Sequence, residues 1–432
     1  MYCILCYDEI SKQLERGIQY MSEQRIIIIA VKSPEQQDDR FESSLEELIS
    51  LSKTAGGVVE KVMTQNRNRI HPATYIGEGK IDEIKQEIDA LDIDLVISND
   101  ELSAGQLRNL GNRLDTPIID RSQLILDIFA QRAKTKEGKL QVELAQLEYL
   151  LPRLHGQGLV MSRLGAGIGT RGPGETKLET DQRHIRRRIH DIKRRLKLVV
   201  RQREQYRKRR KTNDVFQIAI VGYTNAGKST LFNRLTNSNS LEENQLFATL
   251  DPLTREIRLP GGFQTLITDT VGFIQDLPTA LIASFRSTLE EVAEADFILH
   301  IVDSAHPDQE QHQHTVLDLL KDLDAHMIPM LTVYNKSDLV DEDLIAMNHP
   351  SIFISAYDGT DLQRLLLKIE VMLKEEWESY AVNLNPDKGR MLYRLQHETI
   401  ITNKFFDEEK NQYTIQGYMP QEHPLQGLLK EN

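Results

Sequence analysis

One stretch decides the fold: Gly222-Tyr223-Thr224-Asn225-Ala226-Gly227-Lys228-Ser229-Thr230. It follows a continuous apolar run, Val215–Val221, and opens a helix-like run, Ser229–Leu235. The pattern is G-x-x-x-x-G-K-S, in which glycines let backbone N–H groups wrap around a chain of phosphates. Lys228 would reach the β- and γ-phosphates, and the Ser229 hydroxyl would bind Mg²⁺. This strand–loop–helix context argues against a chance match, but the motif alone does not separate GTP from ATP.

A second motif, Asp269-Thr270-Val271-Gly272, comes directly after the apolar stretch Phe263–Thr268. A carboxylate at that place can hold the water shell of Mg²⁺, and the glycine N–H can bind the γ-phosphate. D-x-x-G also occurs by chance in strand-ending turns. Its distance after the first motif favours the phosphate-binding interpretation.

A third motif, Asn335-Lys336-Ser337-Asp338, identifies the base, and it follows the strand-like run Met330–Val333. Asp338 can accept hydrogen bonds from N1–H and the 2-amino group of guanine. Adenine lacks both donors and would leave the carboxylate unpaired, which disfavours it by roughly 2 to 5 kcal/mol. Asn335 could brace the first motif, and the Lys336 stem can lie along the purine. A backbone N–H near guanine O6 would come from the next loop, Ser355-Ala356-Tyr357.

The polar segment Asn237–Asp251 joins the first two motifs and is expected to be mobile. Thr249 is the best candidate there for a hydroxyl that joins Mg²⁺ only when the γ-phosphate is present. Thr254 and Thr236 are the other candidates for this hydroxyl. The alternative for Thr249 is that it is an ordinary loop threonine with no metal-binding role. The predicted catalytic residues are Lys228, Thr249 and Gly272, and the predicted metal ligands are Ser229, Thr249 and Asp269.

Two positions bear on the rate of hydrolysis. Ras-like enzymes use a glutamine after D-x-x-G to orient the attacking water, whereas this chain has Phe273. We therefore expect slow intrinsic hydrolysis that needs outside help. In several GTPases an asparagine at the place of Asn225 helps to bind K⁺, so a K⁺ ion is one hypothesis. The alternative is an asparagine that simply tolerates the turn.

Strand-like and helix-like stretches alternate through most of the chain, which favours an α/β fold. In the first part the candidates are strands Arg25–Val31, Gly57–Thr64, Ala73–Ile76 and Leu95–Ile97, and helices Ser44–Thr54, Lys80–Leu91 and Ser103–Leu114. Gly77-Glu-Gly79 could indicate a second nucleotide site, although a simple strand-to-helix turn is the better interpretation. Around the motifs, continuous apolar runs predict a mostly parallel sheet, with further strands at Phe297–Val302 and Ile352–Ile354. Thr360–Trp377 should be a helix with Thr360 or Asp361 as its N-cap, and Asn383–Lys388 a linker to short strands at Thr399–Phe405 and Gln412–Gly417.

Between these parts, Glu137–Arg153 and Leu178–Lys211 have apolar residues at helical spacing. The glycine-rich segment Leu164–Gly174 joins them, so we expect an antiparallel helical hairpin. From Arg183 to Lys211 the second helix has fifteen basic residues and only two acidic ones, Asp191 and Glu204. That asymmetry predicts a polyanion-facing segment rather than a solvated face of mixed charge.

The net charge of -12 argues against a protein that is coated with nucleic acid throughout. No run approaches the roughly 20 apolar residues of a membrane span, and no secretory signal is evident. Cys3 and Cys6 form a lone C-x-x-C without two more zinc ligands at suitable spacing, so two ordinary cysteines are the preferred interpretation. We expect a soluble, cytoplasmic protein.

Together with their flanks, these motifs resemble the HflX family of ribosome-associated GTPases. Similar segments include Asn68–Lys80, Asp127–Ala133, Gly169–Glu179, Asp269–Pro278 and Ser287–Glu291. The resemblance spans roughly residues 20 to 380 and implies a factor that binds GTP or GDP and the large ribosomal subunit with its rRNA, and that can split ribosomes, notably under stress. Separately, we expect a monomer. Gly165–Gly169 departs slightly from the family's glycine run.

The predicted fold is a P-loop GTPase domain (213–380) preceded by a small α/β domain (1–135) and a basic hairpin (136–212), with a short C-terminal α+β domain (381–432). A GTPase of ribosome or RNA maturation is the alternative function. A small-molecule kinase is disfavoured because this sequence shows no segment that could form an acceptor-binding lid. An RNA-binding protein with a vestigial nucleotide site is disfavoured because it would not need Lys228, Ser229 and Asp269 intact.

Overall fold

The computed structural model describes residues 24–154, 177–212, 215–237, 246–247, 249–275, 291–340, 346–421 and 423–430. The chain divides into two compact units. The first contains Met1–Gln202, Gln245–Asp251 and Gln275–Ser287, and the second contains Arg203–Asn244, Pro252–Ile274 and Thr288–Asn432. Within the described ranges, no helix combines the length and apolar character that crossing a membrane requires.

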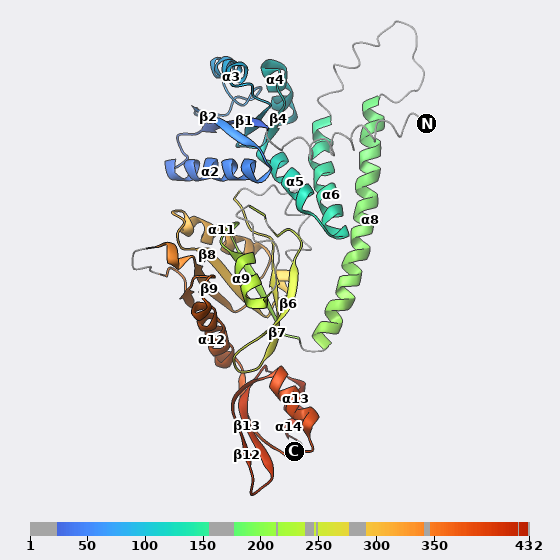
Figure 1. Ribbon diagram of the computed structural model, residues 1–432. Coiled ribbons are helices and arrows are strands. Elements are labelled where there is room, and N and C mark those ends of the chain that lie inside the picture. The colour runs from blue at the N-terminus through green and yellow to red at the C-terminus, as the bar shows by residue number, and fades with distance from the viewer. Residues whose placement is uncertain are drawn as a thin grey trace. The chain divides into compact units, whose positions relative to one another are not determined.

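The first unit is built on a parallel sheet in the order β2-β1-β3-β4 (Figure 1). Apolar side chains alternate between its two faces, as the pleat of a strand requires. On one face, Ile27, Ile29 and Val96 pack against two helices, α3 and α4. The strands are β1 (Arg25–Lys32), β2 (Val58–Asn66), β3 (Leu95–Ser98) and β4 (Ile118–Asp120), and the helices are α2 (Asp38–Thr54), α3 (Glu78–Leu91), α4 (Ala104–Leu114) and α5 (Arg121–Arg132).

The predicted strand at Ala73–Ile76 is wrong. The structure has only an isolated bridge between His71 and Tyr75 there. Tyr75 adopts a positive φ of 66°, which no strand accommodates. Its hydroxyl instead accepts a hydrogen bond from the N–H of Val31 and donates one to Asp100. The tyrosine therefore fills the carboxyl end of the sheet between β1 and β3, beside the turn at Gly77-Glu-Gly79.

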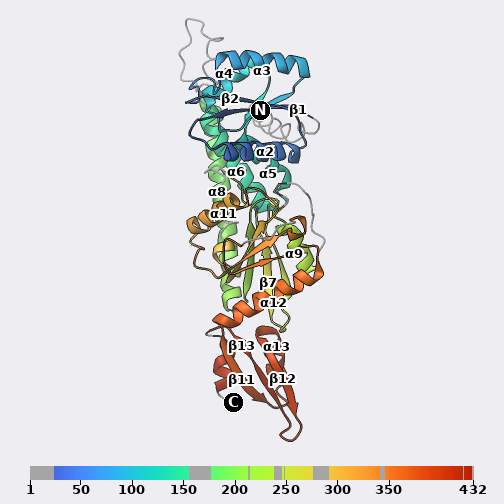
Figure 2. The same ribbon diagram turned by 90° about the vertical axis from the view of Figure 1, so that its left-hand side faces the viewer.

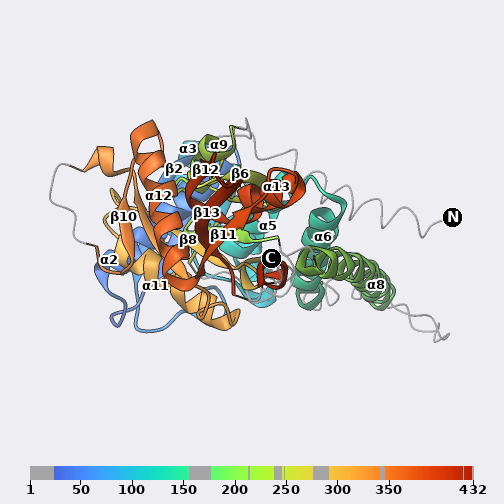
Figure 3. The same cartoon turned by 90° about the horizontal axis from the view of Figure 1, so that it is seen from below.

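The helical hairpin predicted from apolar spacing is present. Helices α6 (Lys136–Arg153) and α8 (Lys177–Thr212) run antiparallel, side by side (Figures 1 and 3). Leu144 and Leu147 of α6 pack against Ile185 and Ile192 of α8. The glycine-rich segment that joins the helices lies outside the described residues, as do Cys3 and Cys6.

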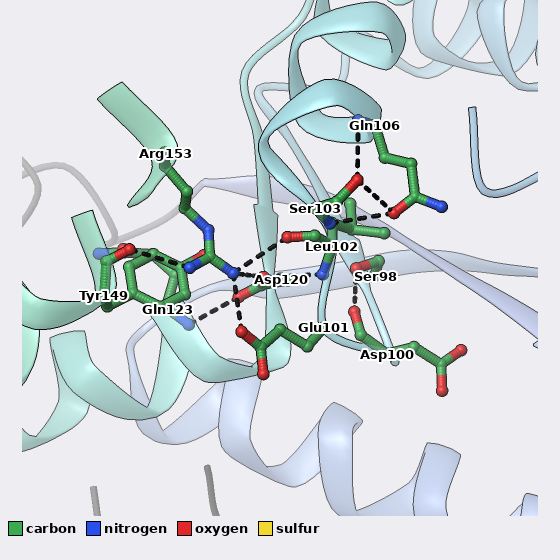
Figure 4. A network of polar contacts seen from close by, with 10 residues as sticks. All are labelled: Ser98, Asp100, Glu101, Leu102, Ser103, Gln106, Asp120, Gln123, Tyr149 and Arg153. Atoms are coloured by element: carbon green, nitrogen blue, oxygen red, sulfur yellow. Dashed lines mark hydrogen bonds and ion pairs between the residues drawn. The ribbon is translucent and has the colours of Figure 1, made fainter. Parts of the chain in front are cut away.

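The end of α6 is fixed by a polar network (Figure 4). Arg153 donates from Nη2 to Glu101, to the Leu102 carbonyl and to Asp120, at 2.9, 3.0 and 3.4 Å. Its guanidinium lies 3.5 Å from the Tyr149 ring centroid. Asp120 is fully buried, and burial raises its pKa although the N–H groups of Leu102 and Gln123 oppose the shift. This network attaches the hairpin to the ends of β3 and β4.

The second unit contains a six-stranded sheet in the order β10-β9-β8-β5-β7-β6, parallel except for β6. Helices α9 and α12 cover one face and α11 covers the other. The strands are β5 (Gln217–Gly222), β6 (Leu253–Arg258), β7 (Gln264–Asp269), β8 (Phe297–Asp303), β9 (Met330–Asn335) and β10 (Ser351–Phe353), and the helices are α9 (Lys228–Thr236), α11 (Gln309–Asp322) and α12 (Gly359–Glu376). The N-cap of α12 is Asp358, not Thr360 or Asp361 as predicted, because its carboxylate accepts from the Thr360 N–H at 2.7 Å.

A three-stranded antiparallel sheet ends the chain, in the order β11-β13-β12 (Figure 2). Its strands are β11 (Glu378–Leu384), β12 (Ile400–Asp407) and β13 (Gln412–Met419), with helices α13 (Gly389–Glu398) and α14 (Pro424–Lys430). The linker predicted at Asn383–Lys388 therefore overlaps a strand. Because β11 begins at Glu378, the sheet starts three residues before the predicted boundary at 381.

Candidate functional site

The loop between β5 and α9 is shaped by two glycines. A Cβ at Gly222 would lie 2.3 Å from the carbonyl oxygen of Ile301, so no larger residue fits. Gly227 has a φ of 90°, and its Cβ would lie 2.3 Å from Nδ2 of Asn335. Asn225 also has a positive φ, 62°, which asparagine tolerates better than most residues. The sequence pattern therefore corresponds to a tight loop that leads into the N-terminus of α9, as phosphate binding requires.

Lys228 is buried within this loop and donates to the carbonyl of Tyr223 at 2.6 Å. Burial lowers the pKa of Lys228 to about 8, although Asp269 opposes the shift. The next residue, Ser229, donates to Oδ2 of Asp269 at 2.8 Å. A hydroxyl and a carboxylate in contact form a set of hard oxygen donors, which is what Mg²⁺ prefers. Thr230 follows, half-buried, in the first turn of α9.

The D-x-x-G segment lies against the loop through its backbone. The Thr224 N–H donates to the Phe273 carbonyl at 2.8 Å, and the Phe273 N–H donates to the Gly222 carbonyl at 3.2 Å. A Cβ at Gly272 would lie 3.0 Å from Nζ of Lys228. The structure therefore brings the two phosphate-binding motifs together.

The Phe273 side chain points into the core. It is 1% exposed and packs with Val221, Ile298 and Val316. The ring belongs to the apolar layer between the sheet and α11. This placement agrees with the expectation that Phe273 does not orient a water molecule.

Asn335 links the base motif to both neighbouring loops. Its Nδ2 donates to the Ala226 carbonyl at 3.0 Å, and its Oδ1 accepts from the Ala356 N–H at 3.0 Å. The Ser355 N–H donates to Asp361 at 2.8 Å. A guanine O6 would thus compete with Asn335 for the Ala356 N–H, a competition that the residue pattern does not predict.

The rim of this region is formed by side chains that reach solvent. Asp338 is exposed, and so is Tyr357, whose ring centroid lies 5.3 Å from the Arg234 guanidinium. Lys336 has a positive φ of 63° and donates to Asp303 at 2.6 Å. Asp303 escaped the sequence analysis, although it ends an apolar strand just as Asp269 and Asn335 do.

Two buried histidines on the α11 side also went unnoticed. His300 in β8 is 1% exposed, and burial followed by the nearby Lys228 lowers its pKa to about 4. His312 stacks on Tyr223 with ring centroids 3.6 Å apart, and burial lowers its pKa to about 4. Both imidazoles are therefore neutral at pH 7. The residues around His300 in β8 are apolar, and they do not indicate that this side chain lies near Lys228.

Thr249 is the one predicted site residue that belongs to the first unit. Its flanks are fixed there. The Phe247 ring meets Phe129 edge-on at 4.6 Å. Asp251 accepts from the N–H groups of Lys134 and Thr135, both at 2.9 Å, and from the Thr135 hydroxyl at 2.5 Å.

The rivals of Thr249 have their hydroxyls engaged. Thr254 lies in β6, 3.0 Å from the Thr268 hydroxyl, and Thr236 donates to the Phe232 carbonyl at 2.7 Å. Both bonds lie within regular structure, and the assignment of Thr249 as the metal-binding threonine stays a prediction.

The described part of α8 has two kinds of basic side chain. Arg188 pairs with Glu143 at 2.6 Å and Lys193 pairs with Glu148 at 2.7 Å, so acidic residues of α6 offset part of the charge. Others are exposed to solvent: Arg186, Arg187, Arg195, Lys197 and Arg201. Among the described side chains of α8, part of the positive charge is therefore paired with α6 and part is open to solvent.

Three protein-family models match successive parts of the chain between residues 42 and 336. A model described as GTP-binding GTPase N-terminal matches residues 42–130, and one described as GTP-binding GTPase middle region matches 132–210. A third, described as 50S ribosome-binding GTPase, matches 217–336.

Curated relatives are similar over most of their length. A protein of Alkalihalophilus pseudofirmus named GTPase HflX is 55% identical over 396 residues, covering 91% of this chain and 94% of that protein. GTPase HflX of Escherichia coli is 41% identical over 388 residues, covering 88% and 91%. A solved structure of a GTP-binding protein from Sulfolobus solfataricus in complex with GDP is 25% identical, with coverage of 79% and 97% and a TM-score of 0.44.

Proposed function

The chain belongs to the HflX family of GTPases, and on that premise we propose that it binds the large ribosomal subunit and splits or recycles ribosomes under stress. It is a GTPase with an intact P-loop domain. The observation that carries the ribosomal part of the proposal is the row of exposed cations on α8. We further propose that the protein acts as a cytoplasmic monomer with the four domains described above.

In the proposed nucleotide site, Lys228 and the N–H groups of the β5–α9 loop hold the phosphates. Ser229 and Asp269 would hold Mg²⁺, Asp269 through water, and Thr249 would join them when the γ-phosphate is bound. The metal supplies positive charge that offsets charge on the phosphate oxygens. Gly272 would offer its N–H to the γ-phosphate. Water attacks that phosphate without a covalent enzyme intermediate, and Lys228 stabilises the charge that develops.

At the other end of the site, Asp338 would accept the two guanine donors. Its carboxylate is exposed and accessible to a base. Asn335 links the neighbouring loops through its hydrogen bonds to Ala226 and Ala356. The Lys336 stem would lie against the purine. We propose GTP and GDP as the ligands on this ground.

The position of Phe273 in the core supports slow intrinsic hydrolysis and stimulation by the ribosome. A K⁺ ion at Asn225 is a second proposed source of acceleration, because its positive charge can take the place of an arginine finger. The positive φ of Asn225 is the competing explanation for an asparagine there. Equal turnover of the wild type in KCl and NaCl would remove K⁺ from the mechanism.

Exposed arginines and lysines bind RNA chiefly through phosphates, which makes the interaction sensitive to salt and largely independent of sequence. Arg186, Arg187, Arg195, Lys197 and Arg201 are spread along about 22 Å of helix at 1.5 Å per residue. We propose that this face contacts rRNA. Hydrolysis would then release the protein from the subunit.

The decisive experiment measures GTP turnover with and without purified large subunits. The wild type should be stimulated, and R186E/R187E should lose most of the stimulation while retaining its basal rate. K53E/K85E, which makes the same charge change at exposed positions of α2 and α3, is the matched control and should behave like the wild type. No stimulation of the wild type refutes the ribosomal proposal. Stimulation by precursor particles alone would favour ribosome maturation instead.

A further inference from the structure

Asp303 is the last residue of β8, and its carboxylate lies beside the base motif. Oδ2 accepts from Nζ of Lys336 at 2.6 Å, and Oδ1 accepts from the N–H of Ala305 at 3.1 Å. In the parallel register of the sheet, Asp303 stands opposite Asn335, the last residue of β9. One carboxylate oxygen, Oδ1, is thus held by the following loop, and the other, Oδ2, binds the lysine.

This contact differs from an ordinary surface ion pair. The Asp303 side chain is 14% exposed and that of Lys336 is 27% exposed. Elsewhere in the same unit, Asp318 and Lys321 form a pair whose side chains are 72% and 66% exposed. Water screens the exposed pair far more than the half-buried one, so the exposed pair is expected to contribute little.

Ser304, the next residue, fastens the same motif through its main chain. Its hydroxyl donates to the Asn335 carbonyl at 2.6 Å, and its N–H donates to that carbonyl at 3.0 Å. Asp303 and Ser304 together hold two successive residues of the motif, Asn335 by the backbone and Lys336 by the side chain.

We propose that Asp303 is a positioning residue for guanine recognition. Its carboxylate fixes the Lys336 ammonium so that the lysine stem forms one wall of the base pocket. The side chain of Lys336 reaches Asp303 at the end of β8, and this ion pair restricts its rotamers. Without the pair, the flexible stem would have to be ordered again at each binding event, which lowers affinity. The inference rests on the proposed guanine site.

Because Asp303 acts at the base, it should affect binding and leave the chemistry at the γ-phosphate alone. We expect D303N to weaken GDP and GTP binding by the same factor, on the order of tenfold for loss of a charge-assisted bond. The KM for GTP should rise by a similar factor while kcat at saturation is unchanged. D303E retains the carboxylate and should recover most of the affinity. D318N, the same substitution in the exposed pair, is the matched control and should match the wild type.

Inosine nucleotides separate this role from that of Asp338. They lack the 2-amino group, so they lose one bond to Asp338 and none to Lys336. The factors by which D303N and the change from guanosine to inosine nucleotide raise the Kd should therefore multiply. For D338N the combined factor should be smaller than the product of the two separate factors, because both changes remove the same bond. A less-than-multiplicative result for D303N would overturn the assignment, since it would mean that Asp303 acts through Asp338.

The measurements use nucleotide alone, without ribosomes, so they do not depend on the ribosomal proposal. If the wild type fails to prefer guanine over adenine nucleotides, the proposed site itself fails. If the wild type prefers guanine but D303N and D318N have the same Kd and KM, the role of Asp303 is refuted. A fall in kcat at unchanged KM refutes it as well. Should D303N unfold below the assay temperature, K336M tests the same ion pair from its other side, because it removes the ammonium and keeps an apolar stem; an unchanged Kd and KM in K336M counts against the proposal.

Discussion

The buried ammonium of Lys228 makes nucleotide binding depend on pH. Burial lowers its pKa to about 8 in the free protein. When a β-phosphate arrives, the added negative charge favours the protonated form and raises that pKa. Binding therefore takes up a proton. Affinity is complete below pH 8 and falls as pH rises above the pKa of the free protein.

The size of the effect follows from the pKa of the free protein. At pH 9 only about a tenth of the molecules would have a protonated Lys228, so the Kd for GDP should be about tenfold weaker than at pH 7, a difference of about 1.4 kcal/mol. The measurement is calorimetric titration of GDP from pH 7 to 9 with EDTA present. Near pH 8, two buffers of different ionisation enthalpy should reveal an uptake of about half a proton.

GMP serves as the nucleotide control, because it has the same base but lacks the β-phosphate that Lys228 would contact. Its affinity should change little over this range. A Kd for GDP that stays constant from pH 7 to 9 would refute the reasoning. So would an equal weakening of GMP, since that would locate the titrating group at the base.

Three further changes probe other parts of the structure. F273Q should not speed hydrolysis, and should lower the free energy of unfolding by about 2–4 kcal/mol by burying an amide in the apolar layer under α11; urea unfolding and turnover check this, and a stable, faster variant would contradict it. G227A should abolish GDP binding because its Cβ would collide with Asn335; measurable nucleotide affinity would show that the loop can relax. D251A removes three hydrogen bonds at the start of α6 and should speed amide exchange there, at a local cost of about 1–3 kcal/mol; unchanged protection by hydrogen-exchange mass spectrometry would show that these bonds contribute nothing.

Residue patterns predicted the elements that are long and apolar. Val215–Val221, Phe297–Val302 and Met330–Val333 correspond to strands within a residue or two, because a strand buried on both faces must be apolar throughout. β6 was missed for the opposite reason. Leu253–Arg258 is an edge strand of alternating character, so its sequence looks like a polar loop.

The parts of the site that sequence could not predict depend on contacts between distant residues. Nothing local in Asp303 indicates that it meets Lys336, and nothing in Ala356 indicates that Asn335 already accepts its N–H. The motifs themselves were recognisable because phosphate and guanine binding need fixed residue types at short spacing. The side chains that support them are free to come from any neighbouring strand.

Helix α6 is attached at both of its ends. At its start, Thr135 and Lys134 bind Asp251 on the segment that contains Thr249, and at its end Arg153 binds Glu101 and Asp120. Its 18 residues span about 27 Å, a length that hydrogen bonds along the helix keep nearly constant. In mechanical terms α6 is a strut with two pinned joints. A displacement of the Thr249 segment along the helix axis must therefore break the contacts at one end of α6 or move the whole helix, so a shift of about one ångström at Asp251 becomes a shift of about the same size at Arg153.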